Sequence, residues 1–276
     1  MDTKKSAARQ RHHYVPRTYL RRFTWDDGLL HVYRVGDPAK KVFTPSVENI
    51  LHERGLYDFS RYPHPGFDAD WVEGLLATFD DTYNQNAITS IDISKDPTLK
   101  EATAFALFGF HQFIRTPRVR DQLFENAKKQ ISPEEHVEGV FDNFGALVIA
   151  GAVQFFPQFI SDIELIFHRL TGFERFLTTD HPVSQWDIET FNPTESLEII
   201  AAEEPFANKR YLFPLSPLFM LEMRPRSKGH GKTLYGRDAS DAQVAQFNEA
   251  ILSGASDFIV LPPNPNAQQA VTPNGP

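Results

Sequence analysis

Near its start the 276-residue chain reads His12-His13-Tyr14-Val15-Pro16-Arg17-Thr18-Tyr19-Leu20-Arg21-Arg22-Phe23. This stretch joins two neighbouring histidines and several arginines to aromatic and aliphatic residues. It is too polar for a plain core segment and too rich in large apolar side chains for a solvated tail. We therefore expect the stretch to dock on a folded core, with its polar side chains gathered at a site.

Composition limits the fold and the function. Hydrophobic residues make up 41% of the chain and aromatic residues 13%, which is enough for a sizeable core. The formal net charge is −8, which argues against a protein that binds nucleic acid non-specifically. Residues 1–24 nevertheless hold seven Lys or Arg and one acidic residue. Positive charge focused near one end favours a localised anion site over a broad basic surface.

The chain contains no cysteine, which excludes disulfides, thiolate nucleophiles and thiolate metal sites. This usage is typical of a cytoplasmic protein, and the charged start lacks the apolar run of a signal peptide. The longest apolar stretch, residues 144–160, is interrupted by Gln154, Pro157 and Gln158. It predicts a buried helix and no membrane span. We therefore expect a cytoplasmic protein without a membrane partner.

The apolar pattern predicts an α+β fold, in which a helical middle region packs with an antiparallel sheet built from N-terminal and C-terminal strands. We expect a disordered basic arm over 1–11, a single α+β domain over 12–262 and a disordered tail over 263–276. Helices are predicted over residues 15–23, 44–51, 70–88, 97–114, 117–130, 132–159 and 238–253. Strands are predicted over residues 29–35, 40–44, 57–59, 163–169, 173–178, 210–213, 218–223 and 257–261, with a hairpin joining 163–169 to 173–178.

The opening stretch is the first of three motifs with side chains suited to chemistry. His12 and His13 are candidate catalytic residues, because imidazole acts as acid, base or metal ligand near neutral pH. Tyr14 and Arg17 are candidate substrate-binding residues, and an arginine fork suits phosphate or carboxylate. The structural alternative is a basic arm whose apolar residues dock on the core while its polar residues stay solvated.

The second motif is Gln112-Phe113-Ile114-Arg115-Thr116-Pro117-Arg118, at the junction of two predicted helices. The start of a helix offers backbone N–H groups and a positive dipole end, which favour an anion. Gln112, Arg115 and Arg118 are therefore candidate substrate-binding residues. The structural alternative is a plain corner between helices with solvated arginines.

The third motif, Leu177-Thr178-Thr179-Asp180-His181-Pro182-Val183, follows a predicted strand. Asp180 is a candidate catalytic carboxylate and, together with His12 and His13, a candidate metal ligand. Thr179 is a candidate substrate contact. The alternative is a turn in which the Asp180 carboxylate caps the backbone.

Weaker features lie outside the three motifs. Glu73 and Asp80 are seven residues apart on one predicted helix, so both could face a cleft, although helical acids are usually solvated. The remaining isolated histidines are interpreted as structural or surface residues: His52, His64, His111, His136, His168 and His230.

In this order the three motifs resemble the bacterial domain of unknown function 4238 family. The shared pattern is His-His-Tyr-Val-Pro-x-x-Tyr-Leu-x-x-Phe, then Gln-x-x-Arg-Thr-Pro-x-x-Arg, then Thr-x-Asp-x-Pro-Val, over about residues 11–262. His181 stands where the family pattern more often has Asn. The resemblance implies that the blocks belong to one domain, and it implies no activity. The matched residues are His12, His13, Tyr14, Pro16, Tyr19, Leu20, Phe23, Gln112, Arg115, Thr116, Pro117, Arg118, Thr179, Asp180, Pro182, Val183 and the pair Pro214-Leu215.

The leading hypothesis is an enzyme for an anionic, phosphate-containing substrate such as a nucleotide or nucleic acid. Phosphodiester hydrolysis is the predicted reaction, with His12 or His13 as acid–base and Arg115 and Arg17 stabilising the developing charge. Asp180 would orient a histidine or hold a divalent metal, for which magnesium, manganese and zinc are equal candidates. The alternative is a non-catalytic module that binds an anion or a protein partner, with the same residues as a structural polar network in which Arg17 pairs with Asp180.

Overall fold

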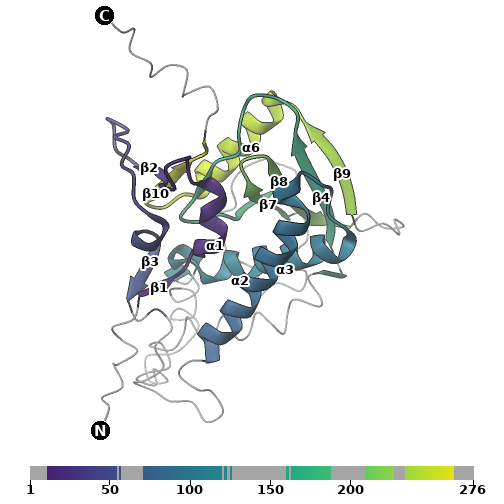
Figure 1. The fold of residues 1–276 in the computed structure, drawn as a ribbon, viewed down its shortest axis with the longest axis horizontal. Helices are drawn as coiled ribbons and strands as arrows, with labels where there is room; N and C mark the ends of the chain where they lie inside the picture. Colours follow the sequence, from purple (N-terminus) through teal and green to yellow (C-terminus); the bar gives the residue numbers. More distant parts are fainter. Residues whose placement is uncertain are drawn as a thin grey trace, which may run out of the picture.

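The computed structural model describes residues 11–54, 56, 71–119, 121–122, 125, 160–161, 163–187, 209–226 and 234–263. The fold is α+β, as the sequence predicts (Figure 1). The helices are α1 (Arg17–Leu20), α2 (Trp71–Thr89), α3 (Leu99–Arg115) and α6 (Asp241–Gly254), with 3₁₀ turns η2 (Arg21–Phe23), η3 (Val47–Asn49) and η4 (Ile91–Ile93). The strands are β1 (Arg11–His13), β2 (His31–Arg34), β3 (His52–Arg54), β4 (Ile163–Leu170), β5 (Thr178–Thr179), β6 (Ser184–Asp187), β7 (Lys209–Ser216), β8 (Phe219–Pro225), β9 (Leu234–Ala239) and β10 (Phe258–Leu261).

The strands form three sheets. The largest has the order β6-β7-β8-β4-β9, and every pairing in it is antiparallel except the parallel pair β4–β9. A second sheet, β2-β10-β5, places the C-terminal strand β10 between an N-terminal and a central strand. The short strands β1 and β3 pair with each other beside α1 (Figure 1). N-terminal and C-terminal segments therefore share a sheet, as predicted.

The long helices begin where their capping residues place them. The Thr98 side chain accepts a hydrogen bond from the backbone N–H of Glu101, and the Glu101 carboxylate accepts one from the backbone N–H of Thr98. Ser240 and Gln243 form the same reciprocal pair at the start of α6. The predicted helices 70–88, 97–114 and 238–253 are confirmed to within a few residues.

The large sheet carries a hydrophobic layer on each face, because alternate residues of a strand point to opposite sides. Phe213 and Met223 face α3, which approaches so closely that a Cβ added to Gly109 would lie 3.0 Å from Cδ1 of Phe213. A larger residue at this contact would need the Phe213 ring to shift by a few tenths of an ångström. On the other face α6 covers the sheet through a cluster of buried side chains that includes Leu212, Met220, Val244, Phe247 and Ile251.

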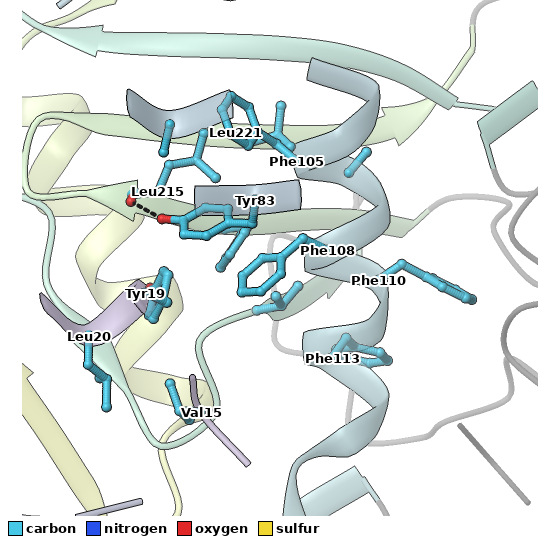
Figure 2. Close-up of a cluster of buried hydrophobic side chains, with 14 of the residues drawn as sticks. Val15, Tyr19, Leu20, Tyr83, Phe105, Phe108, Phe110, Phe113, Leu215 and Leu221 are labelled. Carbon is cyan, nitrogen blue, oxygen red and sulfur yellow. Dashed lines mark hydrogen bonds between the residues drawn. The ribbon is translucent and has the colours of Figure 1, made fainter. Parts of the chain in front are cut away.

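The opening stretch supplies part of this core. Tyr19 is fully buried, and its hydroxyl lies 2.7 Å from Oγ1 of Thr178 and donates to the backbone oxygen of Pro214 at 2.8 Å. Tyr83 of α2 donates to the backbone oxygen of Leu215 at 2.8 Å (Figure 2). Two tyrosine hydroxyls thus fasten the N-terminal segment and α2 to the end of β7.

The predicted hairpin of residues 163–169 with 173–178 is wrong. β4 pairs with β8 along one edge and with β9 along the other. Thr178 and Thr179 pair with Val260 and Ile259 of β10 instead. β8 and β9 offer long ladders to β4, so the segment after Leu170 crosses to the second sheet.

Other predicted elements are shorter than expected or lie elsewhere. Strand 40–44 is reduced to one bridge between Val32 and Phe43, and helix 44–51 to the turn η3. The elements predicted at 57–59 and 132–159 lie outside the described residues, as do 1–10 of the arm and 264–276 of the tail. No helix in the described part of the chain is long and apolar enough to cross a membrane.

Candidate functional site

The opening stretch divides its side chains between the core and a polar site. Val15, Tyr19, Leu20 and Phe23 have no exposed surface, and the first three lie in the apolar cluster of Figure 2. The short strand β1 precedes them, and successive side chains of a strand point to opposite sides. His12 and His13 therefore cannot share one site through their rings.

His12 contacts α2. Its Nε2 lies 3.1 Å from Oε1 of Glu73, with the His12 side chain 3% exposed and the Glu73 side chain 41% exposed. The histidine is thus enclosed by protein while its carboxylate partner reaches solvent. Such a pair can exchange a proton with a molecule outside through the carboxylate.

Arg115 is buried at the end of α3 and makes contacts in two directions. Its Nε donates to the backbone oxygen of Tyr14 at 2.9 Å and to Oε1 of Gln112 at 2.8 Å. Gln112 Nε2 donates to the same Tyr14 oxygen at 2.8 Å. Nη1 of Arg115 lies 3.2 Å from Oδ1 of Asp80 on α2, and Nη2 is buried with no hydrogen-bond partner among the described residues. Burial raises the pKa of Asp80, and the charge of Arg115 opposes that rise.

His111 lies one turn before Arg115 on the same helix. Its Nδ1 is 2.9 Å from the backbone oxygen of Leu107, and its ring centroid is 3.9 Å from that of Phe79. Burial, with a smaller contribution from the charge of Arg115, lowers the pKa of His111 to about 4 although the bond to Leu107 opposes it. His111 is therefore neutral near pH 7, and its Nε2 has no hydrogen-bond partner in the described structure.

These contacts define an N-terminal polar cluster on β1, α2 and α3. Glu73 and Asp80 are two helical turns apart, about 10 Å along α2, and each meets a basic side chain. Their spacing indicated only that both acids could lie on one side of the helix, and their basic partners could not be read from the sequence. The cluster consists of His12, Glu73, Asp80, His111, Gln112 and Arg115.

His13 and Arg17 lie apart from this cluster. His13 Nε2 is 3.2 Å from the backbone oxygen of Val47, and its ring packs edge-on against His52. Burial, together with the charges of Arg17 and His52, lowers the pKa of His13 to about 4. The Arg17 side chain is exposed on α1.

The Thr-x-Asp motif forms a backbone turn. Asp180 accepts hydrogen bonds from the backbone N–H groups of Ser256 at 3.0 Å and Asp257 at 2.7 Å. Thr179 Oγ1 donates to the backbone oxygen of His181 at 2.8 Å. Burial raises the pKa of Asp180, and the backbone N–H donors oppose that rise. No ion pair in the described residues joins Asp180 to Arg17, so this carboxylate caps the backbone as in the structural alternative.

His181 and Arg118 tie the same turn to the helices. His181 Nδ1 lies 2.7 Å from Oγ1 of Thr116, and burial, followed by the charge of Arg118, lowers the pKa of His181 to about 3. Arg118 Nη1 donates to the backbone oxygens of Ser253 and Gly254 at the end of α6. A cation at a helix C-terminus stabilises the helix, which gives Arg118 a structural contact.

The three candidate metal ligands have different surroundings. His12 contacts Glu73, His13 contacts the backbone of Val47, and Asp180 contacts the backbone after α6. Within the ranges that the structure describes, no group of three or more His, Asp or Glu side chains is placed to hold a metal ion.

A second polar cluster lies on the large sheet. His168 Nε2 is 2.7 Å from Oε2 of Glu222, and Oε1 of Glu222 is 3.0 Å from Nε of Arg210. Glu164 pairs with Arg224 one step along the sheet. Burial alone would raise the pKa of Glu222, but the hydrogen bond with His168 and the charges of Arg210 and Arg224 hold that pKa below its usual range. We call Glu164, His168, Arg210, Glu222 and Arg224 the sheet polar cluster.

Sequence reasoning missed the sheet polar cluster because it treated His168 as isolated. One signal was present: Glu164 and His168 are four residues apart in a largely apolar strand, so their side chains lie on the same face. Their partners come from β7 and β8, more than 40 residues later in the chain.

A comparison with protein families matches residues 11–263 to the family described as "Protein of unknown function (DUF4238)". The chain belongs to the DUF4238 family. Searches of curated proteins and of solved structures found no match. The family predicted from the three motifs is thus confirmed, and the DUF4238 match includes every residue of both polar clusters.

Proposed function

We propose that the N-terminal polar cluster is an acid–base site and that the protein hydrolyses a phosphodiester. The observation that carries the proposal is the unequal exposure of the His12–Glu73 pair, 3% against 41%. Glu73 would meet the substrate, and His12 would position the carboxylate and balance its charge from behind. Water attacks phosphorus, Glu73 accepts the water proton, and the P–O bond to the leaving alcohol breaks as that oxygen takes a proton from solvent.

The charges of the cluster favour a monoanionic substrate. Arg115 supplies one permanent cation, while Glu73 and Asp80 supply two carboxylates. A diester carries one negative charge and a monoester close to two near neutral pH, so repulsion by Glu73 is weaker for the diester. A nucleotide diester or a nucleic acid strand would meet this requirement. The proposal includes a cytoplasmic location.

The test uses bis(p-nitrophenyl) phosphate as the diester and p-nitrophenyl phosphate as the monoester. We expect the wild-type protein to hydrolyse the diester faster, and Glu73→Gln to lower the rate at least about 100-fold, as expected for loss of a general acid–base group. Asp81→Asn is the matched control, because Asp81 is an exposed acid on the same helix. No hydrolysis above a buffer blank, or equal rates for Glu73→Gln and wild type, would contradict the proposal.

A non-catalytic role is favoured by one further observation. The Tyr14 carbonyl accepts hydrogen bonds from both Gln112 and Arg115, so these side chains hold the N-terminal segment against α3. If these side chains serve only to hold the N-terminal segment, the wild-type protein would hydrolyse neither ester. Arg115 variants would then change only the melting temperature.

A further inference from the structure

A pocket of about 810 Å³ lies at the far end of α2 from the N-terminal polar cluster. It is lined by α1 and η2, the end of α2, η4 and the turn between β7 and β8. None of the residues of the N-terminal polar cluster lines the pocket, and Glu73, the exposed acid of that cluster, lies fifteen residues before Ile88, about 22 Å along α2. The pocket is therefore a separate site, and its volume is in the range of small-molecule sites.

One part of the pocket wall is apolar and reaches solvent. Ile88 is 53% exposed and Leu218 is 37% exposed, and both line the pocket. Trp25 lines it as well, with its ring stacked on His31 at a centroid distance of 4.0 Å and an interplanar angle of 8°. A planar apolar group would cover these side chains and remove them from water.

The same wall contains two buried polar atoms that need an acceptor. Nε1 of Trp25 and Oγ1 of Thr18 are buried and have no hydrogen-bond partner among the residues described. An indole N–H can only donate, so it requires an acceptor. Both atoms are enclosed by protein, so the donors that an anionic ligand could reach in this pocket are its arginines.

The charged residues of the pocket give it a small positive balance. Three arginines and two aspartates line it. Arg22 and Asp92 neutralise each other through two contacts of 3.0 Å. Arg175 is held by its Nη1 bonds to the backbone oxygens of residues 172–174, and Arg21 is 61% exposed with Glu48 at 4.0 Å. Arg21 and Arg175 therefore outnumber Asp26 by one charge.

From these observations we propose that the pocket binds an organic monoanion with a planar apolar body. The body lies against Trp25, Ile88 and Leu218, and Arg21 and Arg175 bind the anionic group. The opening stretch thus contributes to two sites, with His12 in the cluster and Thr18 and Arg21 in the pocket.

The test uses the fluorescent probe 8-anilinonaphthalene-1-sulfonate, a planar aromatic monoanion, with the intact protein. We expect saturable binding at one site, and Ile88→Glu and Arg21→Glu to weaken it at least about tenfold. Ile93→Glu and Arg237→Glu are the controls, because Ile93 is 63% exposed, Arg237 is exposed, and neither lines the pocket. Melting temperatures would confirm that all four variants fold.

Two further probes separate the parts of the proposal. The neutral N-phenyl-1-naphthylamine lacks the sulfonate and should bind at least about tenfold more weakly, and inorganic phosphate should not compete. The proposal is overturned if wild type shows no saturable binding, if both pocket variants bind as wild type does, or if the controls lose as much affinity. Diester hydrolysis is measured separately, so either site can fail alone.

Discussion

The two polar clusters contain the same kind of pair in opposite surroundings. His12 and Glu73 lie 3.1 Å apart with side-chain exposures of 3% and 41%, whereas His168 and Glu222 lie 2.7 Å apart with exposures of 3% and 4%. Both histidines are enclosed. Only the first carboxylate reaches solvent.

This difference in exposure separates a pair that can meet a substrate from a pair that stabilises the fold. A buried charge is stable only when neighbouring groups replace the water it has lost. His168 and Arg210 do this for the Glu222 carboxylate. Glu73 keeps part of its hydration, so little folding energy depends on its partner. The sheet polar cluster should therefore govern stability, and the N-terminal polar cluster should govern reaction or binding.

We expect the greatest loss of stability when the buried His168–Glu222 pair is disrupted. Glu222→Gln removes the charge that compensates Arg210 and should lower the free energy of unfolding by about 3–5 kcal/mol. Glu73→Gln should lower it by less than about 1 kcal/mol. Urea denaturation at pH 7 measures both variants, and equal losses would remove the distinction between the clusters.

The next effect concerns the arginines of the second motif. Arg115→Met removes the bonds to Tyr14 and Gln112 and leaves Asp80 without its cation, so we expect a loss of about 2–3 kcal/mol. Arg118→Met removes only contacts with carbonyls at the end of α6 and should cost about 1 kcal/mol. Chemical denaturation of the two variants side by side tests this order, which a larger loss for Arg118→Met would reverse.

A third effect depends on pH. Burial lowers the pKa of His181 to about 3, below its ordinary value of 6.5. The unfolded chain therefore takes up the proton first, and the stability that His181 contributes is complete above pH 6.5 and declines as the pH falls. His181→Asn can keep a bond to Thr116 without titrating. Between pH 7 and pH 5 the wild type should lose about 2 kcal/mol more than this variant.

Thermal or urea unfolding at several pH values measures that difference. Asp180, whose pKa burial raises, changes stability in the opposite sense, but it is present in both proteins. Parallel pH profiles for wild type and His181→Asn would show that the buried imidazole does not set acid stability.

We expect the smallest change in stability for an ion pair whose two side chains are both exposed. Arg169 lies 3.2 Å from Asp238, with side-chain exposures of 43% and 62%. Arg169→Ala should change the free energy of unfolding by less than about 0.5 kcal/mol. A loss as large as that of Glu222→Gln would show that exposure does not rank these ion pairs.

Local patterns predicted much of the fold. The spacing of apolar residues located α2, α3 and α6, and the polar residues Thr98 and Ser240 begin two of these helices. The strands β7 and β8 were also found. The hairpin failed because pairing depends on which strands offer the longest ladder to β4, and local turn residues do not report that competition.

The candidate site was predicted only in part for a similar reason. The motifs identified His12, Gln112 and Arg115, which the fold brings to one cluster. Glu73 lies 61 residues after His12 in the sequence, and His111 joins through its position one turn before Arg115. The Asp180 carboxylate accepts hydrogen bonds from the backbone N–H groups of Ser256 and Asp257. The residue type alone does not show whether an aspartate binds the backbone or a ligand.

The most direct test compares the two histidines in one experiment. Protein labelled with ¹⁵N in histidine would be titrated with dimethyl phosphate, a monoanionic diester, while the imidazole nitrogen resonances are followed and assigned with His12→Gln and His168→Gln. We expect a saturable shift of the His12 resonances and none for His168. If His12 stays unmoved while the diester is added to saturation, or if both histidines shift alike, the N-terminal polar cluster is not the site.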